Sequence, residues 1–390
     1  MTPNSPSDNP GVLRQLGDPI ADAALVHIVT GPQPAGIVHA VVAMMRDPAN
    51  APDGFGEWRR GVGVEQPPWL DPEAIRRGRD VFSMWSFQIA ASLACASLPS
   101  AYAGADGARV LAAASDLQPP QHAGVGHPTP SNRVHRRLAE TTQMLVNITT
   151  DESDRPFAPG SQPLATIRSV RLLHAAIRRG LIDGEFPEVH WDCAAWGVPV
   201  NQEDLIGTLC TFTTVVFDGL DRLGVRLSAS DKADYLHLWS VVAWHLGLRC
   251  DQFPLDRPLD LETAGAWHQA IAADQHRPSA HGSGLAQALE AELRRQMPRW
   301  AKRVPATIMH RAAGSEIATM VGIPKPAPWI RVLPLVAVIG RRLTSIPGLR
   351  HTCGWPMRRI GRLVLSGYAR GANGWRKPQF AAGSPGQEEQ

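Results

Sequence analysis

A histidine lies between two arginines in the segment 169–180, which reads Ser-Val-Arg-Leu-Leu-His-Ala-Ala-Ile-Arg-Arg-Gly. Arg171, His174 and Arg178 follow one another at i, i+3 and i+7, which places them along one face of a helix. Apolar residues share this face and predict that it points inward: Leu164, Ile167 and Leu181. Buried guanidinium groups are rarely tolerated without a carboxylate or phosphate partner. The face therefore needs an anionic partner, which either the protein or a ligand supplies.

Haem is one ligand that fits this chemistry. Its iron accepts a neutral imidazole nitrogen, and its two propionates accept bidentate hydrogen bonds from arginine. On this hypothesis His174 is the metal ligand, and Arg171 or Arg178 holds a propionate. The alternative is a histidine of the protein core, with both arginines paired to internal carboxylates such as Asp204 or Asp218.

A second set of polar residues lies in the segment Arg-Leu-Ala-Glu-Thr-Thr at 137–142. Arg137 and Thr141 are four residues apart on one helical face, and Glu140 lies beside them. These side chains could line the distal side of a cofactor pocket, where Thr141 and Glu140 would offer hydrogen bonds or proton transfer near bound dioxygen. The alternative is an ordinary surface ion pair between Arg137 and Glu140.

The spacing of apolar residues predicts the helices that must position both segments. Asp71 is expected to cap the first long helix, and Asn201 with Asp204 resembles a capping box at the start of another. The expected helices cover residues 71–104, 131–148, 164–181, 201–223, 228–247, 261–274, 284–297 and 305–321. No sustained period-2 segment and no repeat of 20–50 residues accompanies them. The sequence therefore predicts an all-α protein with one large multi-helix domain over 13–345, a disordered tail over 1–12 and a basic extension with a disordered tail over 346–390.

Composition excludes several classes of protein. The 390 residues are 44% hydrophobic and 19% charged, which is typical of a packed globular protein rather than a disordered chain. A net charge of +3 gives no support to a strongly basic nucleic-acid binder, and we expect no nucleic-acid partner. The five cysteines contain no C-x-x-C pair, which favours reduced thiols over a compact zinc site. Nucleotide-binding, serine-hydrolase and zincin motifs do not occur.

Membrane signals are weak in the sequence. The first 30 residues contain proline and aspartate where a signal peptide needs a basic start and an unbroken apolar run. The most apolar runs, at 209–217 and 332–339, are shorter than the roughly 20 residues of a spanning helix. The basic segment 350–377 with Trp355 and Trp375 could bind an anionic membrane surface, or it is simply a solvated tail. We expect a cytoplasmic protein that has a possible peripheral membrane contact.

Both polar segments occur together, and in order, with other recognisable pieces. On these pieces the sequence resembles the family of MpaB-type oxygenases and rubber oxygenases (latex clearing proteins) over roughly 15–345. The matching pieces are Trp69-Leu-Asp with Gly78 and Phe82, Arg137-x-x-x-Thr141, Val170-Arg-Leu-Leu-His-Ala with Arg178, Asn201-Gln-Glu-Asp-Leu-Ile-Gly-Thr, Tyr235-Leu-His-Leu-Trp, Met297-Pro298 and Gly322-Ile-Pro.

The resemblance implies an all-α, globin-like helical core that holds haem b, and a dioxygen-dependent reaction on an apolar substrate. His174 matches the family's axial haem histidine, and Arg178 matches the arginine one turn after it. Arg137 and Thr141 match the family's pocket arginine and threonine. Two departures make rubber itself a doubtful substrate: Glu140 stands where rubber oxygenases have a distal lysine, and 103–139 contains no glutamate to match their proposed catalytic base.

Together the residues and the resemblance favour a haem-b-dependent oxidoreductase, an oxygenase that uses dioxygen and an unidentified reductant. Its substrate would be an apolar isoprenoid or lipid-like molecule, with Arg137, Glu140 and Thr141 in catalytic roles. A non-catalytic haem-binding or sensing protein is the first alternative, because the family's distal lysine and glutamate are missing. A helical scaffold without a cofactor is the second. The sequence does not fix the oligomeric state.

Overall fold

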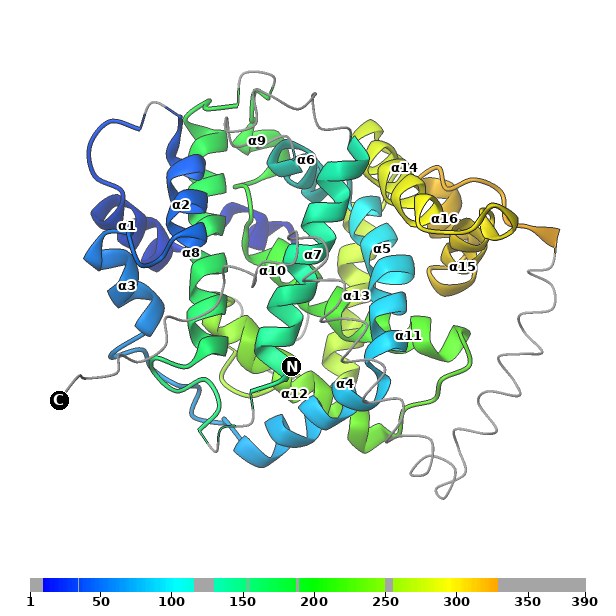
Figure 1. The fold of residues 1–390 in the computed structure, drawn as a ribbon, viewed down its shortest axis with the longest axis horizontal. Helices are drawn as coiled ribbons and strands as arrows, with labels where there is room; N and C mark the ends of the chain where they lie inside the picture. The colour runs from blue at the N-terminus through cyan, green and yellow to red at the C-terminus, as the bar shows by residue number, and fades with distance from the viewer. Residues whose placement is uncertain are drawn as a thin grey trace.

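Two long helices, α4 (Pro72–Ser92) and α12 (Ala229–His245), pack along each other at one end of the molecule (Figure 1). Their approach is close at Gly78, where a Cβ atom would lie 2.5 Å from the carbonyl oxygen of Asp234. Only glycine fits at such a contact. Asp71 caps α4 by accepting hydrogen bonds from the backbone of Glu73 and Ala74, as expected from the sequence.

The computed structural model describes residues 10–33, 35–115, 130–151, 153, 155–186, 189–249 and 255–328. Within these residues it contains sixteen α-helices, two short 3-10 helices and one π-helical turn, with an isolated bridge between Gly104 and His276 and no strand. The prediction of an all-α protein with one large multi-helix domain is confirmed. Most of the predicted tail over 1–12, and all of the extension over 346–390, lie outside the described residues.

α4 continues through the π-helical turn η2 (Leu93–Ser97) into α5 (Leu98–Ala103). This continuous run confirms the helix expected over 71–104. It is also the one stretch, among the described residues, that is long and apolar enough to cross a membrane by length and composition alone. Half of its most apolar window is buried within the molecule, and a helix of the protein core meets the same criterion.

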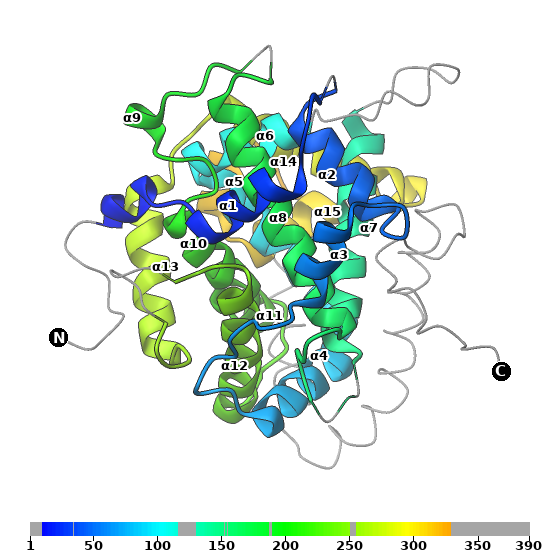
Figure 2. The same ribbon diagram turned by 90° about the vertical axis from the view of Figure 1, so that its left-hand side faces the viewer.

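α8 (Gln162–Ile182) is buried over most of its length, and Figure 2 shows it in the middle of the molecule. Ser161 caps it by accepting from the backbone NH of Leu164, and Pro163 occupies the first turn. Five helices pack against α8: α12 and, in addition, α1 (Pro19–Ile28), α2 (Ile37–Arg46), α3 (Asp53–Arg60) and α7 (Pro130–Thr149).

The helix expected over 201–223 is two helices, α10 (Gln202–Phe212) and α11 (Thr214–Arg222). The expected capping box is present, because the Asn201 side chain accepts from the backbone of Asp204 and the Asp204 side chain accepts from the backbone of Asn201. The break falls at Thr213, whose φ of −124° and ψ of −84° are not helical. Its hydroxyl donates to the carbonyl of Leu209 at 2.7 Å.

The remaining elements lie around the helices described above. They are η1 (Pro10–Gln15), α6 (Ala105–Ser115), α9 (Cys193–Trp196), α13 (Leu261–Gln275), α14 (Ala280–Arg295), η3 (Arg299–Ala301), α15 (Val304–Ala312) and α16 (Ser315–Met320). Helix α6 and helices α1–α3 were not expected from the sequence. The C-terminal group α14–α16 packs against α5 and covers one side of the molecule (Figure 1).

Candidate functional site

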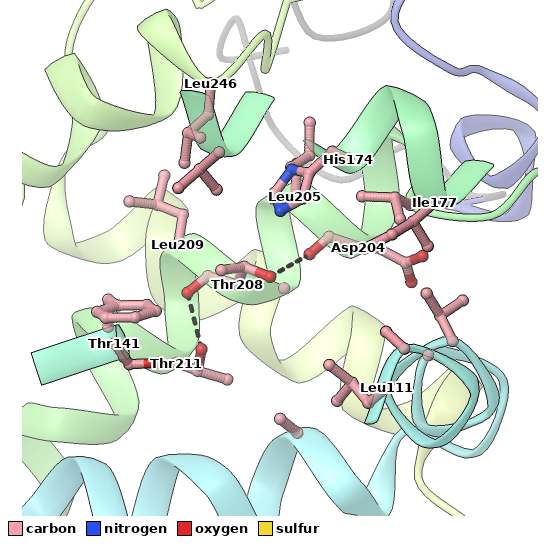
Figure 3. A pocket seen from close by; sticks show the side chains of 18 of the residues that line it. Leu111, Thr141, His174, Ile177, Asp204, Leu205, Thr208, Leu209, Thr211 and Leu246 are labelled. Carbon is pink, nitrogen blue, oxygen red and sulfur yellow. Dashed lines mark hydrogen bonds between the residues drawn. The ribbon is translucent and has the colours of Figure 1, made fainter. Parts of the chain in front are cut away.

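A cavity of about 670 Å³ lies between the central helices (Figure 3). Small-molecule sites commonly have volumes of about 300–1,000 Å³ and mostly apolar walls. This wall is built from α2, α5, α6, α7, α8, α10, α12 and α13, and most of its side chains are apolar. Its apolar members include Val42, Leu111, Met144, Ile177, Leu205, Leu209, Trp239 and Leu246.

The side chain of His174, on α8, lines this cavity (Figure 3). Its Nδ1 atom is buried and has no hydrogen-bond partner. Burial, followed by the positive charge of Arg178, lowers the pKa of His174 to about 4. At neutral pH this side chain is therefore an uncharged imidazole, and its Nδ1 atom makes no hydrogen bond within the protein.

Arg171 and Arg178 do not line the cavity, although they share the helix with His174. The Arg171 guanidinium donates to both carboxylate oxygens of Asp18, at 2.6 and 2.8 Å. Arg178 donates to Asp22. Its other donors reach the backbone carbonyls of residues 199 and 200, at 3.2 and 3.0 Å.

This arrangement corrects the expected role of the two arginines. The geometry gives no support to Arg171 or Arg178 as a propionate ligand, because their donors are already used by α1 and by the loop before α10. The alternative interpretation, in which both arginines pair with protein carboxylates, describes the structure better. The partners, however, are Asp18 and Asp22 rather than Asp204 or Asp218.

Arg137, Glu140 and Thr141 line the same cavity as His174, from helix α7. The structure thus brings together the two polar segments that the sequence singled out. The Glu140 carboxylate is half-exposed and lies 3.6 Å from Arg136 and 3.9 Å from Arg137. The ion pair between Arg137 and Glu140, weighed above as an alternative, is therefore present inside the wall of the cavity.

A third polar group was not expected from the sequence. Arg14 of η1 donates to Glu203 at 2.7 Å and to Asp204 at 3.4 Å, and all three residues line the cavity. Burial raises the pKa of Glu203 to about 7, well above the usual value for a glutamate. The sequence suggested only a capping role here, because acids are common in the first turn of any helix and spacing alone does not reveal that Glu203 is buried.

The side chains of the cavity can be tested against what a haem requires of a protein. Among the residues that the structure describes, no group of three or more His, Cys, Asp or Glu side chains could hold a metal. One imidazole does not make a metal site by itself, whereas a haem brings four nitrogen ligands and needs one or two more from the protein. The unpartnered imidazole of His174 in an apolar cavity fits that requirement.

The matched sequence family defines the class of this protein. Residues 75–370 match the family described as "ER-bound oxygenase mpaB/B'/Rubber oxygenase, catalytic domain", and the chain belongs to this family. The resemblance inferred from the sequence motifs is thereby confirmed.

Two particular relatives are similar to the chain. A rubber oxygenase from Streptomyces sp. (strain K30) is 22% identical over 239 residues, which are 59% of this chain and 56% of that protein. The chain thus matches a little over half the length of this relative. The structure of latex clearing protein in the closed state superposes with a TM-score of 0.64 and 20% identity, covering 91% of this chain and 92% of that one. At this identity the superposition establishes a shared fold.

Proposed function

We propose that the protein is a haem-b-dependent oxygenase that acts with dioxygen on an apolar, isoprenoid or lipid-like substrate. One observation carries the proposal: His174, in a member of an oxygenase family, is a neutral imidazole without a hydrogen-bond partner at Nδ1 and lines a large apolar cavity. When bound, haem supplies the iron that binds and activates dioxygen.

His174 would hold the iron in a globin-like haem pocket, because its low pKa leaves a ring nitrogen free for ligation throughout the neutral range. The propionates need cationic partners other than Arg171 and Arg178. Arg46 carries a guanidinium group on the cavity wall and would bind a propionate, whereas Arg137 keeps its proposed catalytic role beside Glu140 and Thr141.

Thr141 and Glu140 would serve the reaction itself. Both side chains line the cavity on α7, where the threonine hydroxyl can donate a hydrogen bond and the carboxylate can accept a proton. The apolar side chains of the rest of the cavity wall leave room for a hydrocarbon chain. Addition of both atoms of dioxygen across a carbon–carbon double bond, which breaks into two carbonyl groups, balances without a further co-substrate.

Oxygen uptake tests this function directly. Protein loaded with haem and reduced with a chemical reductant is incubated with dioxygen and an isoprenoid or an unsaturated lipid, and products are followed by mass spectrometry over many turnovers. The proposal predicts uptake of dioxygen and a product that contains two new carbonyl groups. Stable haem binding without any product across such substrates would contradict it.

That second outcome would support the alternative, a non-catalytic haem-binding or sensing protein. Glu140 is the observation that favours this alternative, because its carboxylate is placed between Arg136 and Arg137 where rubber oxygenases are expected to carry a lysine. The oxygen-uptake assay therefore distinguishes the two functions.

A further inference from the structure

Two buried polar atoms at one end of the cavity have no hydrogen-bond partner. They are Oε1 of Glu203 on α10 and Oε1 of Gln275 on α13, in side chains of residues that are 1% and 5% exposed. Both residues line the cavity. An unsatisfied buried polar atom is costly, and native proteins contain few of them. Two at the same cavity indicate a place where a ligand completes the hydrogen bonding.

Both side chains belong to the part of the cavity wall that α10 and α13 form, which is the end of the cavity meant here. Helices α10 and α13 pack against each other, and the charge of Asp274, next to Gln275 in the chain, acts on Glu203. Two glycines near the start of α6 approach the same end. A Cβ atom at Gly104 would lie 4.0 Å from the Cβ of Gln275, and one at Gly107 would lie 3.5 Å from the Asp204 carboxylate.

The groups around Glu203 carry charges of both signs. Arg277 and Arg109 both lie beside Asp106, at 2.7 and 3.7 Å, whereas Arg14 faces both Glu203 and Asp204. Burial raises the pKa of Glu203 to about 7, so near neutral pH its carboxyl is protonated in a large part of the molecules. Burial also lowers the pKa values of His268 and His276, the two histidines of the adjoining wall, and so favours their neutral forms.

We propose that this end of the cavity binds the hydroxyl group of an otherwise apolar substrate. A hydroxyl donates one hydrogen bond and accepts others. Its hydrogen would go to Oε1 of Gln275, and its oxygen would accept from the protonated Glu203 carboxyl, so that one group satisfies both unpartnered atoms. The inference rests on the proposed function and narrows its substrate class to isoprenoid or lipid alcohols.

Other head groups fit this end less well. A pure hydrocarbon leaves both oxygens unpaired and buried, which costs the missing hydrogen bonds. A carboxylate or phosphate head adds a second negative charge beside Asp204, whose partner Arg14 is already shared with Glu203. The same argument disfavours a hydrocarbon polymer as the natural occupant of this cavity.

A matched series of ligands tests the inference. Geraniol, geranic acid and the deoxy hydrocarbon with the same carbon skeleton are titrated into the protein at pH 6 by calorimetry. Because a hydrogen bond to a buried group changes affinity by roughly tenfold, we expect geraniol to bind about ten times more tightly than either other ligand. Equal affinities for all three ligands would overturn the inference.

Two variants assign the preference to this end of the cavity. Gln275→Leu removes one of the unpartnered oxygens at nearly constant volume and should remove most of the preference for geraniol. Gln143→Leu, the same change on the α7 side of the cavity, is the matched control and should keep it. An equal loss in both variants would contradict the assignment. Glu203→Gln keeps a donor and the contact with Arg14, so it should also retain the preference.

Measurements with and without haem keep this inference separate from the proposed function. Head-group preference is a property of the α10 and α13 side chains and should be present in both forms of the protein. Failure to take up haem would contradict the oxygenase proposal alone. Uptake of haem without a preference for the alcohol would contradict the head-group inference alone.

Discussion

His174 and Arg178 lie one helical turn apart on α8, yet His174 lines the cavity whereas Arg178 pairs with Asp22 of α1. Within one turn of α8, the His174 imidazole therefore faces the cavity, and the Arg178 guanidinium binds the N-terminal helix α1 to the core through an ion pair. Arg171, one turn earlier, does the same with Asp18. The polar stripe of α8 is thus part binding site and part structural anchor.

The anchoring role predicts a large effect on stability. Arg171 and Asp18 are 8% and 4% exposed, and Arg171→Met would leave the Asp18 carboxylate buried without its ion-pair partner. Removal of one partner of a buried pair costs about 3–5 kcal/mol in the free energy of unfolding. Urea denaturation of the wild type and the variant measures this change.

A surface pair on the same helix provides the control for that experiment. Arg179 pairs with Asp183 in an exposed i, i+4 contact, and Arg179→Gln should cost less than about 1 kcal/mol. If Arg171→Met were no more destabilising than this control, the buried pair would not be the anchor that the structure indicates.

Stability should depend on pH through buried histidines. Burial lowers the pKa of His174 and His276 to about 4 and that of His245 to about 3, against about 6.5 in an unfolded chain. Between pH 6.5 and 4 the unfolded chain therefore binds more protons than the folded one, so the free energy of unfolding falls as pH falls. Above pH 6.5 these groups contribute no further change.

A variant isolates this histidine contribution from carboxyl groups such as Glu203, whose raised pKa acts in the opposite direction. His245→Gln removes one titrating imidazole, so its unfolding free energy should decline less than that of the wild type when urea denaturation is repeated from pH 6.5 to 4. Parallel declines in the two proteins would show that His245 is not held neutral by burial.

Thr141 should affect turnover more than its neighbour. Its hydroxyl is on the cavity wall, whereas the hydroxyl of Thr142 donates to the Leu138 carbonyl of its own helix at 2.7 Å. A group that assists proton transfer commonly contributes 100-fold or more to rate. In haem-loaded protein, Thr141→Val should lower the rate of oxygen consumption by about 100-fold, and Thr142→Val should change it by less than about threefold. Similar rates in both variants would remove Thr141 from the proposed reaction.

Strong local signals explain which elements the sequence could predict. The helix expected over 164–181 is observed as Gln162–Ile182, because a serine cap, a first-turn proline and a regular apolar stripe all agree. The break at Thr213 was missed, since no glycine or proline marks it. Helices α1–α3 were missed because each has only eight to ten residues, too few to show a clear period.

For the candidate site, the sequence predicted which residues share a helical face but not which partners their side chains contact. Helical period places the Cα atoms of Arg171, His174 and Arg178 along one face, but it does not fix where a long arginine side chain ends. The Arg171 guanidinium reaches Asp18, the N-cap of α1, and the Arg178 guanidinium reaches Asp22 within α1, a helix that the sequence did not reveal. The Arg14 and Glu203 contact joins residues 189 positions apart, and such a contact leaves no local pattern in a single sequence.

The visible absorption spectrum of the protein, expressed with added haem precursor, tests the central claim most directly. Wild-type protein should show a Soret band, His174→Ala should lose or shift it, and added imidazole should restore it. His268→Ala, which removes another neutral histidine of the cavity wall, should leave the band in place. A wild-type protein without haem, or a spectrum that His174→Ala does not change, would contradict His174 as the haem ligand.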